Sequence, residues 1–282
     1  MPAAPDLAAL SHSAMPLVIT ENVRWALFLV AGLAATLVWF LALYVGLRFA
    51  QRSLPRRRDK KTDADSVPAV GLLAALFLAV LIFATTSRHG VPWPVDTSLH
   101  RWSVLHRPDG AADAAIVVTT TATGVFAYPL AALAGWLAAP RSPRWRGSLA
   151  AVGALALVQL VRFGLAVAIG RARPPSADWA WHASGPAMPS GHTTTSALVA
   201  ILIVYGAGRR WPQHRGIAAA AAIVWALAVG ASRVYLGVHW PTDVVAGWLL
   251  VIVVAAAMSV AWRTVVRRTP MTRLDRADTD AR

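Results

Sequence analysis

The sequence lacks cysteine and is poor in charged residues. None of its 282 residues is cysteine, which excludes disulfides, zinc–thiolate sites and thiol nucleophiles. Only 14% of the residues are charged, whereas soluble proteins carry roughly a quarter. Because 57% of the residues are hydrophobic, most of the surface is expected to face something other than water.

Acidic side chains are the scarcest charged group. The chain has 13 Asp and Glu against 27 Lys and Arg, a net charge of +14. A nucleic-acid partner would need these basic residues gathered on one soluble domain, and the sequence offers none. No carboxylate cluster accompanies the polar motifs to hold Mg²⁺ or Ca²⁺. We therefore expect no nucleic-acid partner, no metal and no other cofactor.

Long apolar runs dominate the sequence. A helix needs about 20 residues to cross the hydrocarbon core of a bilayer, and seven runs approach or exceed that length. They are Ala26–Leu47, Val67–Thr86, Ala114–Ala139, Ser148–Gly170, His192–Gly208, Gly216–Arg233 and Asp243–Trp262. Gly124 and Pro129 in the third run are tolerable because neighbouring helices can satisfy the freed backbone groups. The predicted fold is all-α, a polytopic membrane helix bundle.

Lysine and arginine are unevenly divided between the loops. The loops after the first, third and fifth runs, together with the tail after the seventh, hold 19 of the 27, and the opposite loops hold seven. Cytoplasmic loops carry the positive excess. We therefore expect a multi-pass protein of the cell membrane with its N-terminus outside and its C-terminus in the cytoplasm. No cleavable signal peptide is expected, since the first apolar run follows an acidic, lysine-free leader.

The predicted organisation has four parts. Residues 1–24 form a flexible external leader, and residues 25–66 an additional transmembrane helix with a basic cytoplasmic loop. Residues 67–262 form the helical core, and residues 263–282 a basic cytoplasmic tail.

Two amphipathic features are expected at the membrane surface. Val95–His106 is predicted to be a short helix in the outer interface, with an apolar face made of Val95, Leu99, Trp102 and Leu105. Several of the 13 tryptophans stand at predicted span ends, where they are expected to anchor the protein. These are Trp25, Trp136, Trp211, Trp240 and Trp262.

Residues suited to phosphate chemistry gather on the predicted outer side. They come from the loop after the fourth run, from the start of the fifth, and from the junction of the sixth and seventh. They are Arg171, Arg173, Ser190, Gly191, His192, Arg233, His239 and Asp243. Arginine binds phosphate oxygens bidentately, and backbone amides at a helix N-terminus favour an anion. Histidine acts as a nucleophile or a general acid near neutral pH, and a carboxylate four residues on can orient its ring.

Each of these residues has a plainer interpretation when taken alone. Arg171 and Arg173 resemble interfacial anchors, Ser190 a helix cap, and Asp243 a charge that stabilises a helix N-terminus. Three separate segments nevertheless deliver these groups to one face of one membrane, which favours a common anionic ligand.

In these residues the chain resembles the type 2 phosphatidic acid phosphatase (PAP2) superfamily, which also includes vanadium-dependent haloperoxidases. That superfamily is marked by Lys-x6-Arg-Pro, by Pro-Ser-Gly-His, and by Ser-Arg-x5-His-x3-Asp. The second block matches fully at residues 189–192, and the third runs from Ser232 to Asp243. The first block has Arg173-Pro174, but Ala166 stands where the lysine is expected.

The resemblance implies a six-helix core, to which the first apolar run is an addition, and a metal-independent lipid phosphatase. It implies that His239 attacks phosphorus to form a phosphohistidine, that Asp243 orients His239, and that His192 protonates the leaving oxygen. Phosphate would be held by Arg173, Ser190, Gly191 and Arg233.

Two cations are candidates to replace the missing lysine. Arg162 lies one turn deeper on the helix face of Ala166, and helical side chains lean toward the N-terminus, here further into the membrane. Arg171 is closer to the expected surface. Arg171 is therefore expected to bind phosphate, and Arg162 is expected to be a poor substitute.

The substrate and the exact reaction remain open at this level. A phosphatidic acid-type lipid or a polyprenyl diphosphate would both fit, and a second lipid could replace water as phosphate acceptor. A non-catalytic transporter or binder of anionic lipids is a further alternative, although transporters usually contain repeats or broken midplane helices, and neither is evident. Haloperoxidase activity is the least favoured alternative, and no feature of the sequence predicts an oligomeric state.

Overall fold

The computed structural model describes residues 62–108, 110–140 and 143–268, and this part of the chain is entirely helical apart from its connections. Its α-helices are α2 (Thr62–Ser87), α3 (Pro94–Leu105), α4 (Ala111–Thr120), α5 (Gly124–Ala138), α6 (Trp145–Ile169), α7 (Gly191–Arg210), α8 (Arg215–Tyr235) and α9 (Pro241–Arg268). Two 3₁₀ turns, η1 (Ser176–Asp178) and η2 (Pro212–His214), lie in connections. The predicted first span lies outside the described residues.

The protein is a multi-pass membrane protein. In the described part of the chain, five helices are long and apolar enough to cross a bilayer, and α4 with α5 makes a sixth if the pair counts as one span. These helices correspond to the second to seventh predicted runs. The all-α, polytopic prediction is confirmed for this part of the chain.

The third predicted run is bent, which was not expected from the sequence. The run expected over Ala114–Ala139 is two helices, α4 and α5, whose axes differ by 47°. The break falls just before Gly124, and Pro129 lies inside α5 without ending it. Two threonines return hydrogen bonds to the preceding turn, from Thr120 Oγ1 to the Ile116 carbonyl at 2.7 Å and from Thr121 Oγ1 to the Val118 carbonyl at 2.6 Å. Such bonds compete with the helix ladder.

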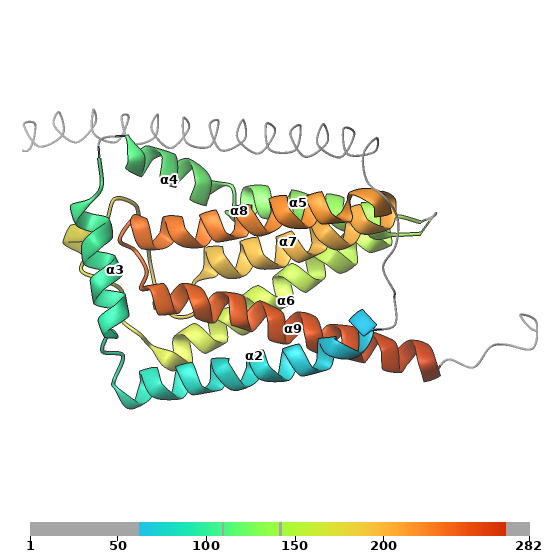
Figure 1. Ribbon diagram of the computed structural model, residues 1–282, viewed down its shortest axis with the longest axis horizontal. Helices are drawn as coiled ribbons and strands as arrows, with labels where there is room; N and C mark the ends of the chain where they lie inside the picture. Colours follow the sequence, from blue (N-terminus) through green and yellow to red (C-terminus); the bar gives the residue numbers. More distant parts are fainter. Residues whose placement is uncertain (1–61, 109, 141–142, 269–282) are drawn as a thin grey trace, which may run out of the picture.

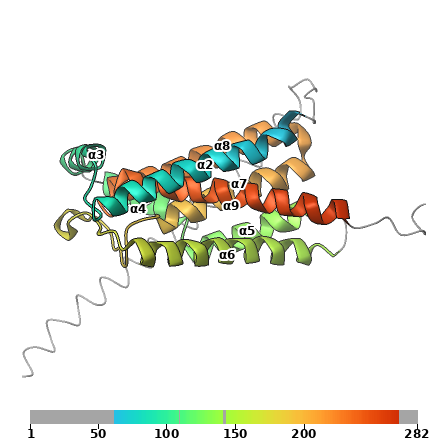
Figure 2. The same cartoon turned by 90° about the horizontal axis from the view of Figure 1, so that it is seen from below.

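The long helices lie side by side and alternate in direction, so that each connection falls at one end or the other (Figures 1 and 2). Helix α3 lies across one end, together with the connections over residues 170–190 and 236–240 (Figure 1). We call this the site end. The connections rich in arginine, over 143–146 and 209–215, lie at the other end. The expected separation of the polar motifs from the basic loops is therefore seen in the fold.

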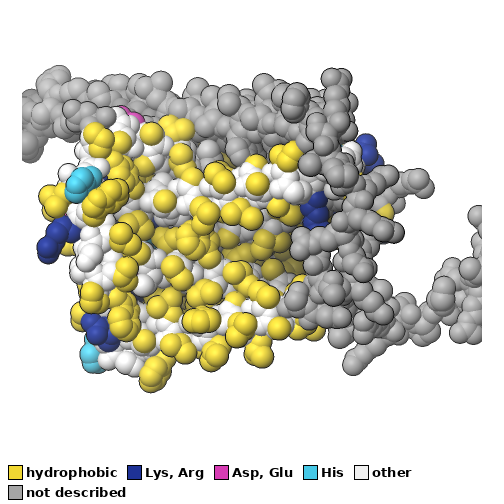
Figure 3. Space-filling model, viewed as in Figure 1, with side chains coloured by type: hydrophobic (Ala, Val, Ile, Leu, Met, Phe, Trp, Pro, Cys, Tyr) yellow, Lys and Arg dark blue, Asp and Glu magenta, His cyan; other side chains and the backbone are white. Residues whose placement is uncertain are grey.

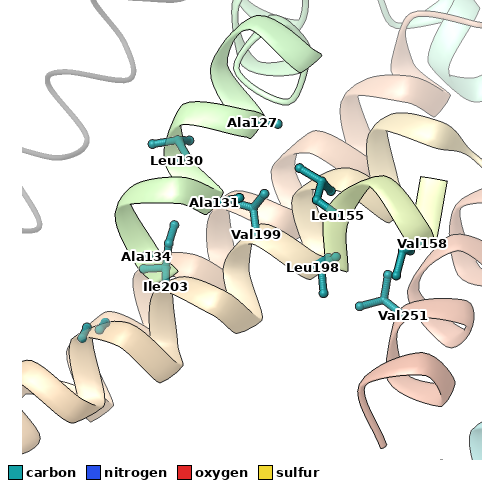
Figure 4. Close-up of a cluster of buried hydrophobic side chains, with 12 residues drawn as sticks. Ala127, Leu130, Ala131, Ala134, Leu155, Val158, Leu198, Val199, Ile203 and Val251 are labelled. Carbon is teal, nitrogen blue, oxygen red and sulfur yellow. The ribbon is translucent and has the colours of Figure 1, made fainter. Parts of the chain in front are cut away.

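Helix α7 occupies the middle of the bundle. Its buried side chains pack between α5, α6 and α9 in the main hydrophobic cluster (Figure 4). Small residues allow close packing around it, and a Cβ on Gly206 would lie 2.5 Å from the carbonyl oxygen of Ala134 on α5. Helix α2 packs against α9 at the edge of the bundle. The central position of α7 fixes the point at which the Pro-Ser-Gly-His segment enters the bundle.

The outward faces of the helices are apolar, as Figure 3 shows for one side of the molecule. Helix α3 confirms its predicted amphipathic pattern. Its apolar residues point outward, with Trp102 55% and Leu105 72% exposed, whereas Asp96, His100 and Ser103 are buried against the bundle. Because the polar face of α3 packs against the bundle, α3 can place a carboxylate against the ends of the bundle helices.

Candidate active site

Three segments meet at the site end: the loop after α6, the start of α7, and the connection from α8 to α9. The start of α7 lies deepest in the bundle. The backbone amide of Ser190 donates to the Asp243 carbonyl at 3.0 Å, which joins α7 to the first turn of α9. Gln159 of α6 donates to the Gly191 carbonyl at 3.2 Å. Arg162 also lies beside Gly191. Arg162 is seven residues before the last residue of α6, which corresponds to about 10 Å along the helix axis. The segment 171–190 therefore returns into the bundle before α7 begins.

His239 is held between a carboxylate and a guanidinium group. Its Nδ1 lies 3.5 Å from Asp243 Oδ2, and its Nε2 lies 2.9 Å from Arg173 Nη1. Arginine has no lone pair to offer, so Arg173 must donate and Nε2 must accept. The proton of the neutral ring is thereby assigned to Nδ1, on the Asp243 side, and the lone pair of Nε2 faces the guanidinium group.

His239 is almost fully buried, with 2% of its surface exposed. Burial, followed by the positive charges of Arg173 and Arg233, holds the pKa of His239 well below its usual range, and a hydrogen bond with the backbone of Ala187 opposes this shift. The imidazole is therefore neutral at physiological pH. A neutral ring with an unprotonated Nε2 is the form that a nucleophile requires.

Asp243 belongs to a buried network of charges. Arg171 Nη1 lies 2.6 Å from Asp243 Oδ1, and Arg171 Nη2 lies 2.6 Å from Asp96 Oδ2, with all three side chains fully shielded. Asp243 Oδ2 also accepts the Trp240 amide at 2.8 Å. Asp96, on α3, accepts the backbone amide of Thr242 at 3.0 Å. One arginine thus ties two carboxylates to the first turn of α9.

Arg171 makes contacts that the sequence did not predict. It was expected to bind phosphate in place of the missing lysine. Its side chain instead spans Asp96 and Asp243, and Nη1 also donates to Thr242 Oγ1 at 2.7 Å. The deviation arises because α3 brings a carboxylate to this point, which no local pattern around Arg171 reveals.

Trp240 also departs from its expectation. It was expected to anchor the protein at the membrane surface, but only 6% of it is exposed. Its indole Nε1 donates to the Ala172 carbonyl at 3.0 Å, and its ring packs edge-on against His100 at 5.3 Å between centroids. Trp240 therefore braces the loop that carries Arg171 and Arg173.

Arg173 and Arg233, both predicted to hold phosphate, lie near the histidines. Arg173 is fixed by backbone carbonyls, including Gly185 at 2.9 Å from Nε and Val238 at 2.8 Å from Nη1. Burial lowers the pKa of Arg173, and the carboxylate of Asp243 opposes this. Arg233 is 2% exposed, and its Nη1 donates to Thr119 Oγ1 at 2.9 Å. Thr119 reaches Arg233 from α4, beside the bend between α4 and α5.

The first turn of α7 has the features of an anion site. Ser190 precedes α7, but its side chain makes no capping hydrogen bond to the helix; Thr193 Oγ1 instead donates to Ser190 Oγ at 3.0 Å. The backbone amides at a helix start have no partner within the helix and attract anions. Half-buried His192 lies in this turn and experiences the charges of Arg233, Arg173 and Arg162.

A close approach between α7 and α9 holds this turn in place. A Cβ added to Gly247 would lie 3.1 Å from the Ser190 carbonyl oxygen and 3.2 Å from the side chains of Thr193 and Thr194. The absence of a side chain at Gly247 therefore lets α9 lie directly against the start of α7.

The sequence did not identify three residues near the site, namely Asp96, Thr119 and Gln159, and it indicated Arg162 only as a poor substitute for lysine. Asp96 and Thr119 come from segments outside the motifs. Gln159 donates to Gly191, and Arg162 Nε donates to Gln159 Oε1 at 3.2 Å. The available signal was that polar residues inside apolar runs usually serve a function.

Across the described part of the chain, no group of three or more His, Cys, Asp or Glu residues could hold a metal ion.

Comparison with known proteins gives a consistent set of relatives. The model of the PAP2 superfamily matches residues 147–267. Phosphatidylglycerophosphatase B of Bacillus subtilis (strain 168) is 31% identical over 179 residues, which cover 62% of this chain and 87% of that protein. The crystal structure of a transmembrane PAP2-type phosphatidylglycerolphosphate phosphatase from Bacillus subtilis has a TM-score of 0.60 at 26% identity, and the match covers 71% of this chain and 98% of the other.

A shorter match is more similar in sequence. Phosphatidylglycerophosphatase B of Escherichia coli (strain K12) is 45% identical over 67 residues, which are 24% of this chain and 25% of that protein. The match thus spans about a quarter of the length of the Escherichia coli protein.

Proposed function

Since the chain belongs to the PAP2 superfamily, we propose that it is a lipid phosphatase that hydrolyses a phosphate or diphosphate ester of a lipid at the outer face of the membrane. One observation carries this proposal. A buried, neutral His239 directs the lone pair of Nε2 toward Arg173 at 2.9 Å, while Asp243 lies on its Nδ1 side. This is a nucleophile oriented toward the place where a phosphate would bind.

The proposed reaction has two steps. In the first, His239 Nε2 attacks phosphorus, the bond from phosphorus to the ester oxygen breaks, and His192 gives its proton to the leaving oxygen. In the second, water attacks the phosphohistidine, the phosphorus–nitrogen bond breaks, and His192 takes up the proton of water. The products are the dephosphorylated lipid and inorganic phosphate, or a lipid monophosphate and phosphate when the substrate is a diphosphate.

Positive charge around the histidines would stabilise the transition state. Arg173 Nη1 would exchange its bond to Nε2 for one to a phosphate oxygen when the substrate binds. Arg233 and the amides around Ser190 and Gly191 would hold the other oxygens. Arg171 would not touch phosphate and would instead position Asp243. The apolar outer face of α3 would lie in the outer membrane interface, beside the lipid substrate.

The test is an assay of the purified chain against several lipids. Phosphatidic acid, phosphatidylglycerophosphate, undecaprenyl phosphate and undecaprenyl diphosphate are supplied in detergent with excess EDTA, and released phosphate is measured. We expect hydrolysis of at least one lipid without added metal, inhibition by orthovanadate, and loss of activity in His239→Ala. Adding a second lipid shows whether phosphate is released or transferred. Lack of hydrolysis of all four lipids, or a strict Mg²⁺ requirement, would contradict the proposal.

A further inference from the structure

Arg162 is a charged residue within an apolar helix, and no carboxylate neutralises it. It is half-buried in the span Trp145–Ile169. Among the residues that the structure describes, Arg162 forms no ion pair, and its two terminal nitrogens donate to no protein group. The ring of Phe163 lies 5.9 Å from its Cζ, which supplies no opposite charge. Charged residues inside membrane spans are costly and usually serve a partner or a ligand.

Gln159 directs this guanidinium group toward the start of α7. Arg162 Nε donates to Gln159 Oε1 at 3.2 Å, while Gln159 Nε2 donates to the Gly191 carbonyl at 3.2 Å and to the Thr195 hydroxyl. A Cβ added to Gly191 would lie 3.6 Å from Arg162 Cζ and 3.8 Å from Nη1. The guanidinium group therefore lies against the residue that begins α7.

The charge of Arg162 acts on both histidines. It contributes to the electrostatic environment of His239, His192 and Arg173. Arg162, Arg173 and Arg233 thus place three positive charges around the two imidazoles, and none of the three is in an ion pair within the described part of the chain. An anionic ligand would supply the missing negative charge.

The position of Arg162 also accounts for the alanine in the first motif. Ala166 stands one turn closer to the membrane surface than Arg162 and is fully buried. Gly191 lies beside Gln159 and Arg162, on the deeper part of α6. An arginine at this depth can therefore reach the first turn of α7 directly. We propose that Arg162 binds the substrate phosphate and takes the part of the absent lysine; this inference rests on the proposed function.

The test compares orthovanadate affinity and lipid hydrolysis in variants of the full chain in detergent. Arg162→Gln removes the charge and keeps a polar, though shorter, side chain. Losing one charge-assisted hydrogen bond corresponds to roughly a 10- to 100-fold effect. We expect that loss both in orthovanadate affinity and in kcat/KM. Arg146→Gln, on the exposed cytoplasmic-side turn of α6, is the matched control and should stay within about twofold of the wild type, because it lies remote from phosphate.

A second variant asks whether the charge itself matters. Ala166→Lys added to Arg162→Gln places an ammonium group at the position of the family lysine, and it should restore at least part of the affinity. Orthovanadate affinity within twofold of the wild type in Arg162→Gln would overturn the inference. If Arg162→Gln does not fold, Arg162→Met, which removes the charge with an unbranched apolar side chain suited to a membrane span, decides in the same way. Hydrolysis by the wild type tests the proposed function separately, since orthovanadate binding is measured without turnover.

Discussion

The ring of His239 shows how much depends on a single side chain. Its charge state is set by burial and by two guanidinium groups, and the direction of its lone pair is set by the Arg173 contact. The sequence supplies the histidine, and it also supplies the aspartate four residues on. It does not reveal how deeply the ring is buried, because that depends on the loop over residues 170–190, from which Arg173 and Ala187 contact the ring.

The pH dependence of activity follows from the lowered pKa of His239. The neutral imidazole is the reactive form, so kcat/KM should fall on the acid side only well below the ordinary histidine value of about 6.5. Arg173→Gln removes a nearby positive charge, so the pKa of His239 should rise and the acid limb should move to higher pH. Profiles are measured with one substrate throughout, which cancels the ionisation of the substrate itself. Arg101→Gln, exposed on α3, is the control, and an unmoved acid limb in Arg173→Gln would contradict the assignment.

The two histidines should respond differently to the leaving group. His192→Ala removes the proton donor, which typically costs 10²–10⁴-fold for a general acid. The loss should shrink with a nitrophenyl phosphate, whose leaving oxygen needs no proton, whereas His239→Ala should be inactive with both substrates. His106→Ala, at the exposed end of α3, serves as the control. Equal losses of His192→Ala with both leaving groups would assign His192 another role.

At the scale of secondary-structure elements, α3 holds the first turn of α9 in place. Its Asp96 accepts the Thr242 amide in the first turn of α9 and pairs with Arg171, which in turn pairs with Asp243. The carboxylate therefore satisfies a helix-start amide that α9 cannot satisfy itself. The orientation of Asp243 thus depends on a helix that carries none of the family motifs.

Breaking this network should destabilise the protein. Arg171→Ala leaves two buried carboxylates without a positively charged partner, and removing one member of a buried ion pair costs about 3–5 kcal/mol. We expect a large fall in melting temperature together with loss of activity. Ala166→Lys should fail to restore either property, although it should rescue Arg162→Gln, because the lost partner is needed by Asp96 and Asp243.

Replacing Asp96 tests the same charge network from its other side. Asp96→Asn keeps an acceptor for Thr242 but loses the negative charge that Arg171 needs, so it should lower both the melting temperature and kcat/KM. Asp113→Asn, exposed on α4, is the matched control. If the two asparagine variants behave alike, α3 does not support the site in the way inferred here.

At the scale of the whole molecule, the polar site and the basic loops lie at opposite ends of the bundle. The charge bias then predicts that the site end faces outward. The chain has no cysteine, so single cysteines can be labelled without background. With a membrane-impermeant maleimide, Ala177→Cys should react in intact cells, and Gln213→Cys should react only after permeabilisation. Labelling of Gln213→Cys alone in intact cells would reverse the orientation and contradict an outward-facing site.

Much of this protein is determined by the sequence alone. Apolar runs of membrane-spanning length predict α2 and the helices from α4 to α9, with α4 and α5 as a single run, because a backbone in lipid must satisfy its own hydrogen bonds. The pattern of Val95–His106 predicts α3, since one face of a helix repeats every 3.6 residues. The motif residues Ser190, His192, His239 and Asp243 are identified from short-range spacing. Each of these inferences depends on residues close together in the chain.

Only the tertiary structure decides which cation faces which anion. From the sequence, Arg171 was expected to bind phosphate and Arg162 was discounted, because helical side chains lean toward the helix N-terminus. That expectation took the site to be level with the end of α6, whereas α7 begins beside Gln159 and Arg162. The partner of Arg171, Asp96, is 75 residues away in the chain. Depth of a helix start and contacts across such distances depend on how whole helices pack, and no local pattern of residues encodes them.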